Sequence, residues 1–215
     1  MEEKMKKRIL ALLVAAMVAM LAFAGCSSDS ASTDDDATEE ATAETSTAAA
    51  ASVGEEAGFQ EYPIFEDIEV GFLNVSAVYF QPVPMSNGNE DIEGYDLHLE
   101  ADVSALENDL GFGVGDWVPY MTVDYEVINE DTGETAAEGT FMVMSASDGP
   151  HYGANIALPD AGTYTVIFTF GSPEDNGYLL HTDDETGPGG SFDDYWGDGA
   201  LTVEYTGWEY TPQEW

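Results

Sequence analysis

Basic residues are nearly absent from this chain of 215 residues, which has 4 Lys and Arg against 43 Asp and Glu. All four lie between Lys4 and Arg8, so a chain beginning at Cys26 would keep 41 acids and no Lys or Arg. Such a chain cannot neutralise phosphates, which excludes nucleic acid as a partner. Its charge attracts cations, although on charge alone the simpler interpretation is that the acids serve solubility.

Cysteine is also scarce, because Cys26 is the only one in the chain. A disulfide within the chain is therefore excluded. A blue-copper electron-transfer site is excluded as well, since it needs a Cys thiolate. A structural zinc site is disfavoured because such sites usually take Cys. Stability must come from packing, helped by metal or by dimer contacts.

The first 25 residues have the pattern of a secretory signal, which is a basic start followed by an apolar run from Ile9 to Ala24. The segment "LAFAGC" resembles a lipobox and ends at Cys26. We therefore expect residues 1–25 to be a lipoprotein signal peptide and Cys26 to carry the lipid. Two acyl chains on one residue suffice for stable anchoring. The expected location is extracytoplasmic, lipid-anchored to the cell membrane in a periplasm or at a cell surface. The alternatives are an ordinary signal peptide or an uncleaved anchor.

Residues 26–58 consist mainly of Ser, Thr, Ala, Asp and Glu. Such a segment has too little apolar surface to offset the entropy of ordering, so we predict an acidic, disordered tether. Aromatic residues recur from Phe59 to the C-terminus. Residues 59–215 have the usual size of one domain and are predicted to form it.

Alternating apolar and polar residues dominate this domain. In "YDLHLEADV", Leu97 and Leu99 point one way while His98 and Glu100 point the other. Similar alternation, separated by turn signals, recurs at 68–80, 120–128, 140–146, 163–170 and 200–208. About seven short antiparallel strands with polar outer faces predict an all-β, immunoglobulin-like antiparallel β-sandwich. The prediction covers the architecture only, because the Cys…Trp…Cys signature is absent.

Three histidines are the most distinctive polar residues of the domain. His98 and Glu100 leave the same face of one predicted strand, His151 follows a Gly-Pro turn, and His181 precedes an acidic turn. Together with the thioether of Met144, these groups are the ligands that copper prefers. The alternative is that the histidines are ordinary surface residues and that Met144 fills the core. Spacing alone does not bring these residues together in space.

Several motifs resemble the bacterial periplasmic iron-transport protein family, which includes pathogen-specific membrane antigen lipoproteins. They are "AVYFQPVPM", "DLHLEADV", "GTFMVMSASDGPHYGANIAL" and "HTDDETG", within a match from about residue 61 to about 207. The resemblance implies an immunoglobulin-like sandwich, a homodimer, copper and iron as bound metals, and a membrane iron permease as partner.

The resemblance also assigns metal ligands to positions of this sequence, with Asp148 as the candidate for a second, oxygen-rich iron position. The expected function is that of a lipid-anchored, extracytoplasmic copper- and iron-binding protein for high-affinity iron uptake, and not of an enzyme. Two alternatives stay open, a copper-dependent ferroxidase and a non-catalytic structural or adhesive surface module. The metal-site residues expected in this way are His98, Glu100, Met144, Asp148, His151 and His181.

Overall fold

The computed structural model describes residues 60–215. The predicted signal peptide (1–25), the lipidation site at Cys26 and the tether (26–58) lie outside the described residues. Within the described part, no helix is long and apolar enough to cross a bilayer.

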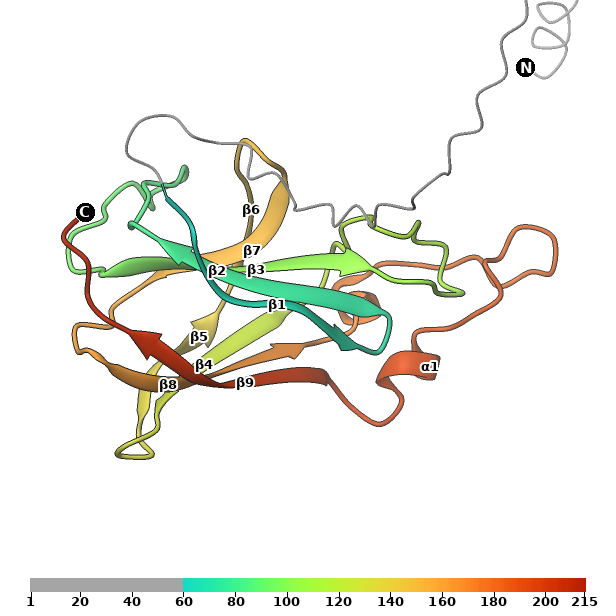
Figure 1. The fold of residues 1–215 in the computed structure, drawn as a ribbon. Helices are drawn as coiled ribbons and strands as arrows, with labels where there is room; N and C mark the ends of the chain where they lie inside the picture. The colour runs from blue at the N-terminus through green and yellow to red at the C-terminus, as the bar shows by residue number, and fades with distance from the viewer. Residues whose placement is uncertain (1–59) are drawn as a thin grey trace, which may run out of the picture. The chain divides into compact units, whose positions relative to one another are not determined.

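Two antiparallel β-sheets packed face to face make up the fold (Figure 1). One sheet has five strands in the order β1-β2-β3-β7-β6, and the other has four in the order β5-β4-β8-β9. The predicted all-β, immunoglobulin-like sandwich is confirmed, although residues 60–215 form nine strands instead of about seven. The elements are β1 (Tyr62–Val70), β2 (Leu73–Phe80), β3 (Leu97–Ala105), β4 (Val123–Asn129), β5 (Thr135–Thr140), β6 (Met142–Ser145), β7 (Pro150–Ile156), β8 (Gly162–Phe170), η1 (Pro173–Asn176), α1 (Asp193–Trp196) and β9 (Leu201–Tyr210).

The core lies between the two sheets and is rich in aromatic rings. Phe65 of β1 packs on Phe168 of β8 with ring centroids 5.8 Å apart, and Tyr79 of β2 packs on Trp208 of β9 at 5.3 Å. Each such ring stabilises the fold by about 1.5–3 kcal/mol through burial. These contacts fix one sheet on the other, so the strands that carry the polar residues have a rigid base.

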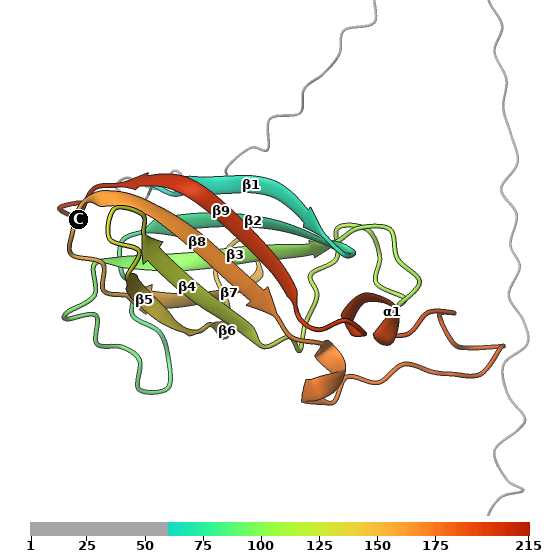
Figure 2. The same ribbon diagram turned by 90° about the horizontal axis from the view of Figure 1, so that it is seen from below.

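The long connection between β8 and β9 carries η1 and α1 at one end of the sandwich (Figure 2). The indole Nε1 of Trp196 donates to the carbonyl of Phe170 at 2.9 Å, which holds α1 against the end of β8. The amide of Gly190 donates to the carbonyl of Asp109 at 2.8 Å. The connection therefore packs near the end of β3, four residues beyond Ala105.

The outer face of the five-stranded sheet differs from the sequence prediction of a solvent-exposed polar face. His98 is fully buried and Glu100 is only 4% exposed. Beside His98, the connection between β2 and β3, residues 81–96, contacts this face. Its residue Val83 exchanges two hydrogen bonds with the side chain of Asn155 on β7. The phenyl ring of Phe80 lies 5.1 Å from the His98 ring.

Candidate metal centre

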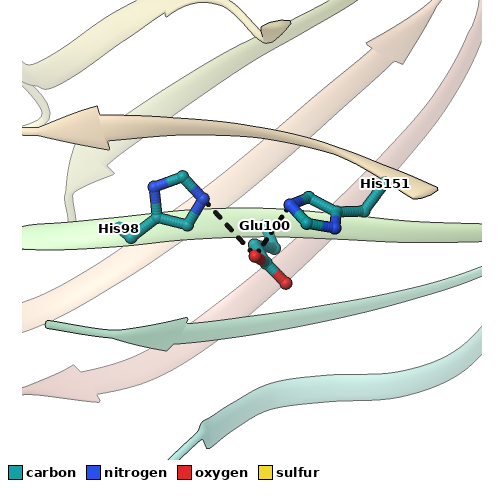
Figure 3. Close-up of side chains that lie close together, drawn as sticks. All are labelled: His98, Glu100 and His151. Carbon is teal, nitrogen blue, oxygen red and sulfur yellow. Dashed lines mark ion pairs between the residues drawn. The ribbon is translucent and has the colours of Figure 1, made fainter. Parts of the chain in front are cut away.

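Strand register brings together residues that are far apart in the sequence. In the pairing of β3 with β7, His98 lies opposite Asn155 and Glu100 lies opposite Gly153. Paired residues of antiparallel strands point to the same face, and so do residues two apart on one strand. His98, Glu100 and His151 therefore share the outer face of the five-stranded sheet, where their side chains converge (Figure 3).

The three side chains form a compact and buried group. Nε2 of His151 lies 2.9 Å from Oε1 of Glu100, and Nε2 of His98 lies 3.4 Å from the same oxygen. One ligand atom from each residue lies within 4.8 Å of the others. Their exposed fractions are 0% for His98 and 4% for both Glu100 and His151. Two imidazoles and a carboxylate are thus held together away from bulk water.

The side chain of Asn155 fixes the protonation of the His98 ring. Its Nδ2 donates to the carbonyl of Val83 at 2.8 Å, and its Oδ1 accepts from the amide of Val83 at 3.1 Å. This pair of bonds sets the orientation of the amide, so Oδ1 is the atom that meets Nδ1 of His98 at 2.8 Å. An amide oxygen only accepts, and Nδ1 must therefore carry the proton. In the neutral ring, Nε2 then holds a lone pair.

This lone pair has no hydrogen-bond partner in the described part of the chain. Nε2 of His98 is buried 3.4 Å from the Glu100 carboxylate, and Nε2 of His151 lies 2.9 Å from the same oxygen, a distance at which a protonated ring donates a hydrogen bond. A buried lone pair that faces a carboxylate is unfavourable unless a cation lies between them. A metal ion would satisfy all three groups at once, and a hydrogen bond to the other ring nitrogen, such as that from Asn155 to Nδ1 of His98, orients a ligating His. The donor set fits copper.

Gly153 leaves the space that this arrangement needs. A Cβ at this position would lie 2.8 Å from Nε2 of His98 and 3.1 Å from the carbonyl oxygen of Leu99. Any side chain would therefore displace the His98 ring. At Gly153 the backbone itself therefore lies beneath the space that His98, Glu100 and His151 surround.

Comparison with known proteins identifies the family. Residues 58–212 match the family model described as Fe2+ transport protein. The chain belongs to this family. It is 42% identical over 165 residues to the 34 kDa membrane antigen of Treponema pallidum, which covers 74% of this chain and 78% of the antigen.

Two solved structures of similar proteins have the same fold. FetP of uropathogenic Escherichia coli is 43% identical, with a TM-score of 0.65 over 73% of this chain and 100% of FetP. A copper-reconstituted protein of Campylobacter jejuni is 39% identical, with a TM-score of 0.65 over 72% of this chain and 99% of that protein. A variant of FetP has also been solved with copper bound.

In this member of the Fe2+ transport protein family, protons and a metal ion would compete for the same groups, Glu100 and His151. Burial raises the pKa of Glu100, but contacts with His151 and His98 outweigh it and hold the pKa below its ordinary value. Burial lowers the pKa of His151, but Glu100, Asp102 and Asp148 outweigh it and the pKa is raised. The apo centre therefore favours a carboxylate beside a protonated His151.

Three further carboxylates surround the pair, and two of them were not singled out by the sequence. Burial first, and then Glu100, raise the pKa of Asp102 to about 6, although its side chain keeps contact with solvent. Burial and then Asp148 raise the pKa of Glu61. Asp102 continues the alternation of His98 and Glu100 along β3, so the pattern indicated its face. Glu61 precedes β1, and no local pattern indicates its position here.

Two other predicted ligands, Met144 and Asp148, lie on or beside the same face. Met144 of β6 is half-buried and pairs in register with His151, so both share the outer face. Asp148 is exposed in the turn between β6 and β7 and acts on His151 through its charge. The ligand roles of both residues stay predictions.

His181 is not part of this group within one chain, and its role as a ligand stays a prediction. It is exposed in the β8–β9 connection, and its Nδ1 lies 2.8 Å from Oγ1 of Thr186. Among the His, Cys, Asp and Glu side chains of the described residues, the group with ligand atoms close together consists of His98, Glu100 and His151. The physical reason is that the β8–β9 connection packs near the end of β3, whereas His98 lies at its start.

Proposed function

We propose that this protein is an extracytoplasmic metal-binding protein that holds copper at the centre formed by His98, Glu100 and His151 and serves iron uptake. The observation that carries the proposal is the convergence of two buried Nε2 atoms on one carboxylate oxygen, at 2.9 Å from His151 and 3.4 Å from His98. Membership of the Fe2+ transport protein family and the copper-bound relatives support it independently.

The copper ligands proposed here are the Nε2 atoms of both histidines, the carboxylate of Glu100 and the thioether of Met144. The thioether favours Cu(I), and the carboxylate favours Cu(II). Bound copper would supply one-electron redox chemistry. The chain itself orients His98 through Asn155, whose side chain is in turn held by the backbone of Val83.

Iron is proposed as the cargo, held close to copper by oxygen ligands. Glu61, Asp102 and Asp148 act electrostatically on one another and on the His151–Glu100 pair. Carboxylates suit hard cations, and a cation among them would offset both the burial and the repulsion that raise the pKa of Asp102. These carboxylates have no Lys or Arg nearby to pair with in the described part of the chain, so they are free to bind iron.

The cellular setting follows the same proposal. Cys26 would carry a lipid anchor, residues 26–58 would serve as the tether, and a membrane iron permease would receive the iron. An extracytoplasmic location agrees with a relative named as a membrane antigen. A homodimer is proposed as well, because a second copy could bring the exposed His181 to a metal centre.

Copper affinity tests the proposal directly. We expect His151→Ala to abolish tight Cu(II) binding in a chelator competition, and Glu100→Gln to weaken it by about tenfold or more. Glu204→Gln is the matched control, because Glu204 is an exposed carboxylate of β9 on the other sheet. Wild-type affinity in the His151 variant would refute the assigned site.

A ferroxidase is the second candidate, supported by carboxylates beside the copper ligands. In that reaction Fe(II) is oxidised and O2 is the electron acceptor, so oxygen uptake measures it. Oxygen uptake by the copper form above that of free copper with Fe(II) would establish this activity. Its absence would leave a binding and transport role.

A further inference from the structure

A second methionine lies on the same face as the metal centre. Met142 of β6 pairs in register with Gly153 of β7, and Gly153 pairs with Glu100 of β3. The row Glu100–Gly153–Met142 therefore crosses three neighbouring strands of one sheet, with no side chain on the middle strand. All three residues face outward, because paired residues share a face.

The geometry of the row lets the two outer side chains approach each other. Neighbouring strands lie about 4.8 Å apart, so the Cα atoms of Glu100 and Met142 are about 10 Å apart. The space between them lies above Gly153, where Nε2 of His98 already approaches to 2.8 Å of the position that a Cβ would occupy. A long, unbranched and flexible thioether side chain can reach this space from the open side.

Packing does not explain the methionine at this position. Met142 is 37% exposed and lies outside the hydrophobic core, on a four-residue edge strand. Val143, the next residue, faces the opposite way and is 58% exposed. A partly exposed thioether in line with a buried carboxylate and two buried imidazoles has the chemistry of a soft metal ligand.

We propose that Met142 is a second thioether ligand of the copper centre and selects for Cu(I). The inference rests on the proposed copper site and adds to it. The centre then offers Cu(I) two soft sulfur ligands and two imidazole ligands. The sulfurs come from Met142 and Met144 on β6, and the imidazoles from His98 on β3 and His151 on β7. Glu100 serves Cu(II), which prefers nitrogen and oxygen. The solvent-facing thioether also gives Cu(I) its point of entry.

Parallel measurements of Cu(I) and Cu(II) affinity test this role. Cu(I) is titrated against a chromogenic Cu(I) chelator in ascorbate, and Cu(II) against an amino-acid chelator in air. We expect Met142→Leu to weaken Cu(I) binding by about tenfold or more and to change Cu(II) binding by less than about threefold. A selective tenfold loss of Cu(I) affinity lowers the copper potential by about 59 mV.

Two further variants separate this inference from the proposed function. Val143→Ala changes the opposite face of the same edge strand and is expected to alter neither affinity. Met144→Leu removes the thioether already proposed as a ligand and should also weaken Cu(I) binding. If Met144→Leu weakens binding and Met142→Leu does not, only the present inference is wrong. If the wild-type protein binds no copper, both are wrong.

X-ray absorption of the Cu(I) form gives an independent reading. We expect one sulfur scatterer fewer in the Met142→Leu variant than in the wild type. An unchanged sulfur contribution would overturn the inference even if the affinity had changed.

Discussion

Gly153→Ala should damage the metal centre without removing any proposed ligand. The added Cβ would lie 2.8 Å from Nε2 of His98 and 3.1 Å from the carbonyl oxygen of Leu99. Ordinary contacts begin near 3.4 Å, so Nε2 must move by roughly 0.6 Å. Metal sites tolerate deviations of only about 0.2 Å in ligand distance. The proposed copper centre should therefore lose one imidazole.

The expected loss of Cu(II) affinity is about 10–100-fold, the range for a change that misplaces a ligand without deleting it. Overpacking next to the Leu99 carbonyl should also cost the apo protein about 1–3 kcal/mol in free energy of unfolding. Chelator competition measures the first effect, and urea unfolding of the metal-free protein measures the second.

Gly171→Ala is the matched control for this substitution. A Cβ at Gly171 would meet its nearest atom, the carbonyl oxygen of Thr122, at an ordinary 3.5 Å. We expect this variant to keep wild-type copper affinity. If Gly153→Ala also keeps it, the reasoning that places the metal above Gly153 is refuted.

Three other predictions follow from the same contacts. Asn155→Leu removes the acceptor that orients the His98 ring and should lower copper affinity about 10–100-fold in the same competition assay, with unchanged affinity as the contrary result. Copper affinity should fall as the pH falls, because protons compete with copper for the ligating nitrogens. The pKa of His151 is raised above 6.5, so the decline in affinity should begin above pH 6.5. A flat affinity profile between about pH 7 and 5 would contradict this prediction. Tyr152→Phe leaves the buried carbonyl of Val118 and the amide of Met121 unpaired, which should cost about 1–3 kcal/mol in urea unfolding, whereas a cost near zero would show that other partners replace the hydroxyl.

Local sequence patterns were sufficient for the sandwich and for part of the centre. The alternation in β3 placed His98 and Glu100 on one face, and the structure confirms that they lie together. The position of His151 depends on the register of β3 with β7, which pairs residues more than fifty apart. No periodicity reveals such a register, so this part came from family resemblance.

Two features of the centre could not be predicted from local sequence patterns, for a physical reason. The orientation of His98 depends on Asn155, which is held by Val83 of the irregular segment 81–96, and this is a tertiary interaction. The separation of His181 from the centre depends on where the long β8–β9 connection packs. Irregular connections lack the repeating patterns that make strands predictable.

Anomalous diffraction at the copper absorption edge from a copper-soaked crystal tests the central claim most directly. We predict one strong peak above Gly153, within bonding distance of Nε2 of His98 and Nε2 of His151. A strong peak bound elsewhere, with both Nε2 atoms still free of metal, would contradict it.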